Sequence, residues 1–370
     1  MQDQTTGMAT TRPTRQGQLL RALFALAAAV IILAGIRGAV DIVVPILLSL
    51  VVAMLFSPIY AWLLKRGAPT WLAIVLMLVF LVVTITLLVI FLAQSMASFT
   101  SQLDYYTSLL TTRSDELQQW LSNTLNINLD LNSIANPKGL EQASREILAG
   151  ITHVLGSAFF IVLMILFFLA EGPAIVGRLR AFAGPDNPQV TRLNSIVKSV
   201  IKQFGVRAII NSTIAAVFTI VLLLLGVDFP YMWGVLAFFM GFVPYIGQVI
   251  AIIPPAILAL AEYGWPSAIA VVIAMIVIDG LAENIMSPMM MSRTLSLSPT
   301  FVFVSFLAWT WVLGPVGAIL AMPITYTLAA MLGTFPEGEW LANIMIVPTE
   351  DKKASKTPNI AGEAQPVTPP

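Results

Sequence analysis

The sequence predicts an all-α polytopic membrane protein with about eight membrane segments, on the basis of composition and of the length of its apolar runs. The 370 residues are 58% hydrophobic and 10% charged, with a mean hydropathy of +0.88, whereas soluble domains carry about 25% charged residues. Apolar runs of about 20 residues recur along the chain, the length that a membrane-spanning helix needs. Strands of a membrane barrel would instead alternate over about ten residues.

The first three membrane helices are expected within residues 19–94, after a polar segment 1–18 that contains Arg12 and Arg15. The apolar runs cover about 19–36, 42–64 and 71–93. A cleavable signal peptide is the alternative for the first run, because basic residues precede an apolar core. We favour a retained helix, because the run is long and no clean small-x-small cleavage pattern follows it.

Residues 95–150 predict a water-exposed, mostly helical insert. The segment is rich in Ser, Thr, Asn, Gln and acidic residues, while Leu103, Tyr106, Leu110 and Leu117 keep a helical period. Residues 126–131 alternate and are expected to form a short extended piece. The fourth membrane helix is expected over 151–170.

A basic segment, residues 171–207, separates the fourth helix from the fifth, which is expected over 208–227. Its apolar positions line one helical face, and Arg192, Lys198 and Lys202 lie away from the centre of that face. This pattern is typical of a helix at the membrane interface whose basic side chains contact acidic lipid headgroups. A helix that packs on the membrane bundle is the alternative.

The sixth and eighth apolar stretches, residues 231–263 and 299–332, are overlong and interrupted by proline and glycine. Because a single tilted span needs only about 20 residues, each is interpreted as either a crossing segment or a re-entrant hairpin of two short helices. Paired interruptions point to a transport site at a repeat interface, and chance similarity is the alternative, since Gly and Pro are common in membrane helices. The interrupting residues are Pro244, Gly247, Pro254 and Pro255 in the sixth stretch, and Pro315, Gly317 and Pro323 in the eighth.

Two carboxylates mark the seventh stretch, residues 266–286. Asp279 and Glu283 are four positions apart, so they share one face of a helix. A carboxylate near the bilayer centre costs about 2.5–3.5 kcal/mol on insertion scales and usually faces a water-filled path, where it binds a cation or a proton. The alternative places both near the external interface, hydrated or paired with Arg293.

Three amide side chains complete the candidate transport residues: Asn211, Gln248 and Asn284. Each is expected at or near membrane depth, where the simplest role is a hydrogen bond between helices, worth about 0.6 kcal/mol on average. Gln248 is the strongest candidate for contact with a solute, because it adjoins the interruption at Pro244–Gly247.

The distribution of basic residues predicts the orientation, since Lys and Arg are enriched in cytoplasmic loops. The basic groups lie at 12–21, 65–66, 178–207 and 352–356. An even number of spans then places both termini in the cytoplasm and the insert outside. A crossing sixth segment would put Glu262 near the cytoplasmic face. The polar, proline-rich tail 333–370 is expected to be disordered.

Several function classes are excluded by absent residues. The chain has no cysteine and one histidine, which excludes disulfides, thiolate chemistry and a His-rich metal site, and no cofactor is expected. No glycine directly precedes a lysine, so a P-loop ATPase is excluded, and no nucleophile elbow or zinc-protease motif suggests an enzyme. Lys+Arg and Asp+Glu are balanced at 19 each, which gives no support for a nucleic-acid partner.

Three blocks of the second half resemble the AI-2E family, the bacterial autoinducer-2 exporters also called PerM-type predicted permeases. The blocks are Val243-Pro-Tyr-Ile-Gly247; Asp279-Gly280 with Glu283-Asn284, Ser287-Pro288-Met289 and Leu297-Ser-Pro299; and Gly314-Pro-Val-Gly317 with Pro323. The resemblance covers about residues 20–332. It implies a multi-pass protein of the bacterial inner membrane, a homo-oligomer, and export of autoinducer-2 or sodium–proton antiport. Proline is common in the family where this chain has Gln248.

We therefore expect a secondary transporter or exporter that moves a small polar, autoinducer-2-like solute or exchanges sodium and protons, in contact with membrane lipid. A passive oligomeric channel is one alternative. The other is a non-transporting membrane scaffold whose insert recruits a partner.

Overall fold

The computed structural model describes residues 15–125, 156–290 apart from 173, 176, 179, 180, 183, 185 and 186, then 296–333, 338, 341 and 344–347. The described chain is helical apart from one two-residue strand pair and the connecting turns, which confirms the predicted fold class. The helices are α1 (Arg15–Gly38), α2 (Val40–Lys65), α3 (Thr70–Ser101), α4 (Leu103–Leu125), an apolar helix Gly156–Gly172, α6 (Pro188–Leu225), α7 (Pro230–Met240), α8 (Gly247–Tyr263), α9 (Trp265–Leu281), a π-helical turn η1 (Ala282–Met286), α10 (Ser287–Met290), α11 (Pro299–Leu313) and α12 (Pro315–Leu332).

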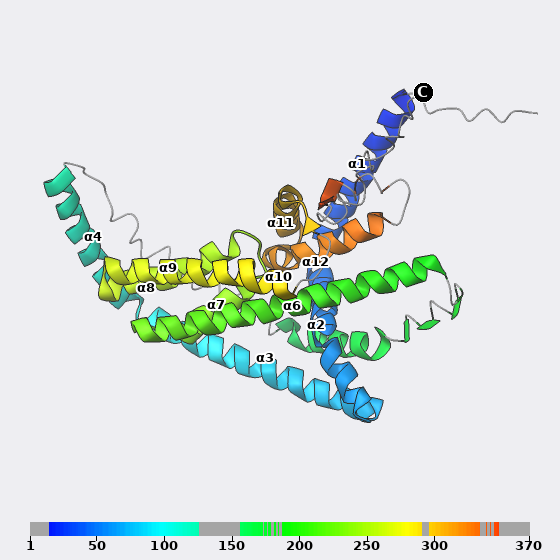
Figure 1. Ribbon diagram of the computed structural model, residues 1–370, viewed down its shortest axis with the longest axis horizontal. Coiled ribbons are helices and arrows are strands. Elements are labelled where there is room, and N and C mark those ends of the chain that lie inside the picture. Colours follow the sequence, from blue (N-terminus) through cyan, green and yellow to red (C-terminus); the bar gives the residue numbers. More distant parts are fainter. Residues whose placement is uncertain are drawn as a thin grey trace, which may run out of the picture.

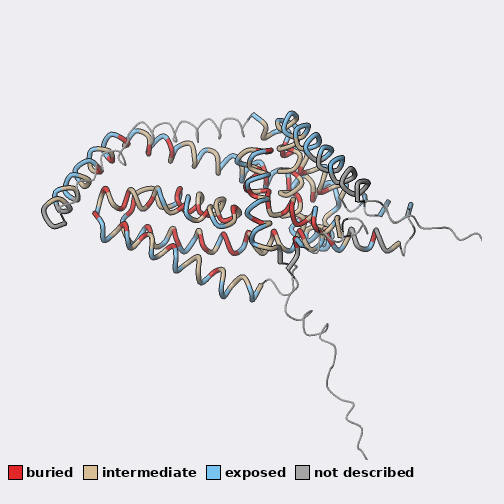
Figure 2. The backbone as a smooth tube through the Cα atoms, turned by 90° about the horizontal axis from the view of Figure 1, so that it is seen from above, coloured by how far each residue is buried: buried red, intermediate tan, exposed pale blue. Residues whose placement is uncertain are grey.

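Five of the described helical segments are long and apolar enough to cross a membrane: Val40–Lys65, Thr70–Ser101, Asn194–Leu225, Trp265–Met290 and Pro315–Leu332. In Figure 1, α3, α6, α8 and α9 run along the long axis of the molecule, with α4 at one end and α1 at the other. Buried residues lie along the faces where helices touch, and large outer faces stay uncovered (Figure 2). In the most apolar window of α3 only 11% of the residues are buried, so most of this surface is left for lipid or for other copies of the chain.

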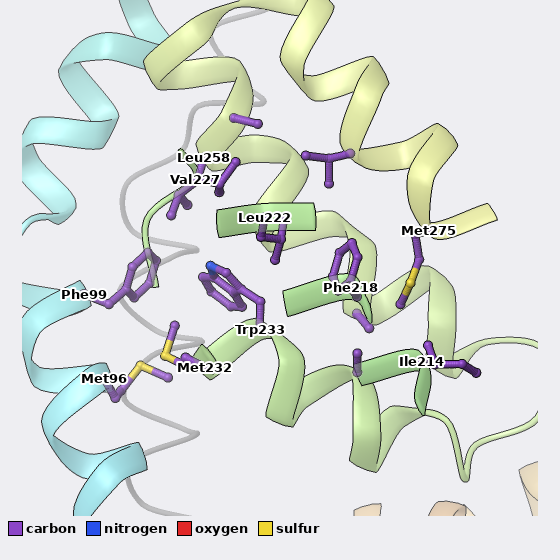
Figure 3. Close-up of a cluster of buried hydrophobic side chains, with 14 of the residues drawn as sticks. Met96, Phe99, Ile214, Phe218, Leu222, Val227, Met232, Trp233, Leu258 and Met275 are labelled. Carbon is purple, nitrogen blue, oxygen red and sulfur yellow. The ribbon is translucent and has the colours of Figure 1, made fainter. Parts of the chain in front are cut away.

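The main core lies between α3, α6 and the segments that follow α6. Trp233 stands at its centre (Figure 3). The ring of Phe99 meets Trp233 edge to face, with centroids 5.7 Å apart, and Phe218 and Leu222 of α6 are fully buried beside them. Aromatic pairs of this geometry add about 0.5–1.5 kcal/mol beyond the area they bury.

Helix α6 is one continuous helix of 38 residues, about 57 Å long at 1.5 Å per residue. The expected boundary between an interfacial helix and a fifth span at residue 207 is therefore wrong. The reason is that buried positions recur every four residues through Ile196, Val200, Phe204 and Ala208 without a change of phase. Three of them pack against Tyr326 of α12, so the basic segment packs on the bundle, which was the alternative interpretation.

The sixth stretch is a hairpin rather than a crossing segment. Helix α7 has 11 residues, about 16 Å, roughly half of a hydrocarbon core about 30 Å thick. The chain then turns through residues 241–246, and α8 returns to the level from which α7 started. At that level the Tyr263 hydroxyl donates to the carbonyl of Gly226, 2.9 Å away. Glu262 consequently lies at the α4 end of the molecule, not at the opposite end as a crossing segment would require.

The eighth stretch is a second hairpin, which turns at Gly314 with φ 69°. The indole N–H of Trp309 on α11 donates to the hydroxyl of Thr325 on α12 at 3.1 Å. Its open end is closed by strands β1 (Ser296–Leu297) and β2 (Ile346–Val347), which pair antiparallel. The expectation of disorder from residue 333 onward is therefore wrong for Ile346–Val347.

The two hairpins enter from opposite ends of α6, and their tips meet beside its middle. The first opens at the C-terminal end of α6, where Gly226 follows that helix. In the second, Tyr326 packs on the N-terminal half of α6. Between them, Val243 of the first tip packs against Phe306 and Ala318 of the second hairpin. Opposed, interrupted segments that meet in this way resemble the arrangement that builds sites in many secondary transporters.

Candidate functional site

Gly247 and Gly317, which interrupt the sixth and the eighth stretch, have the same structural role in the two hairpins. A Cβ atom on Gly247 would collide with the carbonyl oxygen of Met240, and one on Gly317 would collide with that of Trp309. Each glycine therefore lies in the first turn of the returning helix, where it lets that helix touch the backbone of the incoming one. The prolines downstream do not break their helices, because α8 continues through Pro254 and Pro255 and α12 through Pro323.

The tip of the first hairpin is tight. Tyr245 adopts φ 62°, a left-handed conformation that is uncommon for a bulky residue, and the Ile246 N–H donates to the carbonyl of Pro244 at 2.7 Å. Strained backbone of this kind costs about 1–3 kcal/mol and tends to occur at functional sites. Pro244 thus belongs to the turn itself, and Gly247 begins the helix after it.

Arg207 of α6 connects this tip to the seventh stretch. Its Nε and Nη2 atoms donate to the carbonyl of Gly241, at 2.9 and 2.6 Å, and its Nη1 atom forms an ion pair with Glu283. The last carbonyls of a helix have no partner within that helix, and here the guanidinium of Arg207 supplies one for the C-terminus of α7. The side chains of Arg207 and Glu283 are 26% and 38% exposed, so water or a solute can reach the pair.

Glu283 lies on the π-helical turn η1, which follows α9 without a break. A π-helical turn inserts one extra residue per turn and is frequent at functional sites. Asp279 stands on the last turn of α9 and interacts electrostatically with both Glu283 and Arg207. The two predicted carboxylates therefore belong to one charged cluster, with Arg207 as its cation.

Three side chains around this cluster carry buried polar atoms without a hydrogen-bond partner. They are Asn211 (Oδ1), Gln248 (Oε1 and Nε2) and Asp279 (Oδ1). Asn211 is completely buried; its Nδ2 donates to the carbonyl of Phe238 at 3.2 Å, but its oxygen is free. A buried unsatisfied polar atom costs about 1–3 kcal/mol, so several such atoms together point to a site that a polar solute or water completes.

The fold places these atoms at one level. Asn211 lies one helical turn after Arg207 on α6, and its amide occupies the space that a side chain on Gly241 would need. Helices α8 and α9 run antiparallel on either side of Gly264, so Gln248, 16 residues before this turn, lies level with Gly280, 16 residues after it. Asp279 is the neighbour of Gly280. Arg207, Asn211, Gln248, Asp279 and Glu283 are called the tip cluster below.

Other predicted site residues lie elsewhere. Asn284 is exposed, and its Nδ2 donates to the carbonyl of Gly280 in its own helix at 2.8 Å, so it turns away from the tip cluster. Lys198 and Lys202 are exposed on α6, where headgroup contact stays a prediction; the side chain of Arg192 lies outside the described residues. Arg293 lies outside them as well, and Glu283 has Arg207 as its ion-pair partner.

Arg207 is the site residue that sequence reasoning missed, because it was counted with the cytoplasmic basic residues. One signal was present in the sequence. Arg207 and Asn211 are four positions apart on one helix face, as Asp279 and Glu283 are, so each helix contributes a polar i, i+4 pair.

Comparison with known proteins agrees with this fold. A family model described as "AI-2E family transporter" matches residues 23–337. "Putative transport protein YhhT" of Escherichia coli (strain K12) is 32% identical over 343 residues, which cover 91% of this chain and 97% of that protein. "AI-2 transport protein TqsA" of the same organism is 28% identical over 329 residues, covering 88% and 95%. The match covers the hairpins, the tip cluster and α4 alike, and on this basis the chain belongs to the AI-2E family of transporters.

Proposed function

We propose that this transporter moves a small, polar, hydroxyl-bearing solute through the bacterial inner membrane and that the tip cluster binds it. The observation that carries this proposal is the set of free buried atoms around the Arg207–Glu283 ion pair. The set contains acceptors on Asn211 and Asp279, and both a donor and an acceptor on Gln248.

The mixture of donors and acceptors supports a hydroxyl-bearing solute over a metal cation as the substrate. A hydroxyl group donates and accepts at once, so a polyhydroxylated solute can satisfy both kinds of free atom. A metal cation takes only oxygen acceptors, would leave the Gln248 N–H group unsatisfied and would meet the positive charge of Arg207. The printed name of TqsA, an AI-2 transport protein, supports a solute of the autoinducer-2 type as the first to test.

Transport by this site requires that the hairpin tip moves. Arg207 holds the tip by its hydrogen bond to the Gly241 carbonyl and holds η1 by its ion pair with Glu283. A solute that hydrogen-bonds to either partner competes with the guanidinium and loosens one of the two connections. The free energy of solute binding thereby favours the conformation in which that connection is broken. This preference couples occupancy of the site to movement in a carrier.

Cation exchange is the second candidate, because Asp279 has a free carboxylate oxygen next to Glu283. Carboxylates inside membrane proteins commonly serve as proton or sodium sites. In that case Asp279 takes up the coupling ion, while the amides of Asn211 and Gln248 bridge water.

The test is flux in proteoliposomes that contain the purified full chain, measured separately for autoinducer-2 and for sodium-dependent proton movement. Saturable autoinducer-2 flux that Gln248→Ala and Arg207→Gln abolish supports the solute carrier. Sodium–proton exchange lost in Asp279→Asn supports the second candidate. Lys198→Gln, an exposed cation on the same helix as Arg207, is the matched control. Flux that does not saturate indicates a channel, and unchanged flux in Arg207→Gln, Gln248→Ala and Asp279→Asn would refute the site.

A further inference from the structure

A second group of titratable side chains lies at the open end of hairpin α7–α8, the end opposite to the tip cluster. Asp228 is in the turn between α6 and α7, Glu262 is near the end of α8, and Tyr106 comes from α4. These residues lie outside the five segments that are long enough to cross a membrane. None of them has a part in the transport site proposed above.

The contacts hold three separate elements together. The buried hydroxyl of Tyr106 donates to Asp228 Oδ2 at 2.6 Å and lies 3.0 Å from Gln102 Oε1. The carboxyl of Glu262 lies close enough to Asp228 for the two side chains to interact, and its buried Oε2 atom has no hydrogen-bond partner. The backbone carbonyl of Asp228 accepts from the indole of Trp233 at 2.9 Å. Two neighbouring carboxyl groups that are shielded from water favour holding one proton between them, because like charges repel strongly there.

No described basic side chain relieves this repulsion. The titratable groups around the pair are Tyr106 of α4, which donates to Asp228, and Tyr105, which acts on Tyr106, while the hydroxyl of Tyr263 is bonded to Gly226. Burial, followed by the hydrogen bond and the charge of Asp228, raises the pKa of Glu262 from 4.5 to about 7. Burial and the same two carboxylates raise the pKa of Tyr106 as well, so its hydroxyl stays protonated.

The carboxyl pair lies directly beside the surface on which α4 rests. Leu110 of α4 is buried against Ala261, the residue before Glu262, with Leu109 and Ile257 at the edge of this contact. Apart from its covalent connection to α3, the described part of α4 makes its main contact with α8. The N-terminal turn of α4 is anchored separately, because Leu103 and Tyr106 are buried in the main core. A charge repulsion at Glu262 therefore acts on the contact of Leu110 with Ala261 and on the hydrogen bond of Tyr106 with Asp228.

We propose that Asp228, Glu262 and Tyr106 form a proton-binding latch that docks α4 on hairpin α7–α8. While the carboxyl pair holds a proton, Glu262 donates it to Asp228, Asp228 accepts from Tyr106, and α4 is docked. When Glu262 loses that proton to water, the two carboxylates repel each other, and the part of α4 around Leu110 separates from α8. The latch links the water-exposed insert to the element whose other end forms the transport site.

The direction of the pH effect follows from linkage. An acid whose pKa is raised in the docked state favours docking at low pH, and that stabilisation is lost as the pH rises from about 4.5 through about 7. If undocking returns Glu262 to its ordinary pKa, the undocked fraction rises by at most about tenfold between about pH 6 and about pH 8. Solvent screening at this half-buried pair lowers that factor.

The cysteine-free chain permits a direct test with one introduced thiol. Leu110→Cys places the thiol in the contact with α8, and Ser108→Cys, on the exposed side of the same helix, is the control for the intrinsic pH dependence of maleimide labelling. In full-length protein in vesicles, the labelling rate of Leu110→Cys relative to Ser108→Cys is expected to rise severalfold between about pH 6 and about pH 8. Adding Glu262→Gln, whose amide donates to Asp228 at every pH, is expected to keep the ratio low and flat.

A second variant, at the other carboxyl group, controls for misfolding of the first. Asp228→Asn removes the repulsion from the other carboxyl and is expected to flatten the ratio in the same way, while Tyr106→Phe raises it at both pH values. An unchanged Ser108→Cys rate shows that each variant keeps its fold. A ratio independent of pH in the parent background, or the same rise in both Glu262→Gln and Asp228→Asn, would overturn the latch and leave the transport site untouched.

Discussion

Arg207 and Glu283, 76 positions apart in the chain, form an ion pair beside the tip of hairpin α7–α8. The same guanidinium holds the carbonyl of Gly241. One side chain thus joins the middle of α6 to both elements that differ most from ordinary membrane helices, the interrupted hairpin and the π-helical turn η1. The predictions below test this connection and the hairpin that depends on it.

The ion pair is expected to show strong coupling in a double-mutant cycle. Arg207→Gln leaves Glu283 without its cation and the Gly241 carbonyl without a donor, and we expect a loss of about 1–3 kcal/mol in stability, because both groups are only partly exposed. In the Glu283→Gln background the same change is expected to cost less, since no unpaired carboxylate remains. Thermal unfolding of the four proteins in detergent measures the coupling, with Lys198→Gln as control. Additive effects would show that the pair contributes nothing as a unit.

Asn211 and Gly241 are expected to show a rescue of one variant by the other. A methyl group on Gly241 would lie 2.6 Å from the amide of Asn211, so Gly241→Ala forces a completely buried side chain to move and costs on the order of 1–3 kcal/mol. Asn211→Ala opens that space, and the double variant is expected to be more stable than Gly241→Ala alone. The same unfolding assay checks this rescue, and a double variant less stable than both single ones would contradict the packing described.

The two hairpin glycines are expected to respond alike. Gly247→Ala and Gly317→Ala each place a methyl group against a backbone carbonyl, which cannot rotate away as a side chain can, so each is expected to destabilise by more than about 1 kcal/mol. Gly205→Ala on α6 is the matched control, because its Cβ would have nothing within 4 Å and alanine favours helices. Loss of stability in only one of the two hairpin variants would refute the equivalence of the two turns.

The re-entrant path of residues 231–263 predicts which side of the membrane labels them. Tyr231 and Tyr263 lie at the two ends of the hairpin and are exposed, as is Tyr105 on α4. Single cysteines at these three positions are expected to react with a membrane-impermeant maleimide from one side, and a cysteine at Lys198 from the other. Labelling of Tyr231→Cys and Tyr263→Cys from opposite sides would show that the segment crosses the membrane.

Much of the candidate site was predictable from residue type alone. Asp279 and Glu283 were recognisable because carboxylates are costly in an apolar helix, and Gln248 because it follows an interruption. Arg207 was not, because an arginine at the end of a basic segment has the same local pattern whether it lies in water or reaches a carbonyl from another helix. Asn284 was expected in the site as an amide near membrane depth, but it is exposed and donates to the carbonyl of Gly280 in its own helix.

The sequence by itself determined that this protein is a helical membrane protein and which two stretches are interrupted, because these properties depend on local hydrophobicity and on Gly and Pro. Only the tertiary structure decided that both stretches turn back as hairpins and that the hairpins approach from opposite ends of α6. It also decided that Arg207 connects the tip of the first hairpin to Glu283. The physical reason is that a crossing segment and a hairpin satisfy the same local backbone and hydropathy requirements. The choice between them is made by distant contacts, such as Tyr263 with Gly226 and Val243 with Phe306.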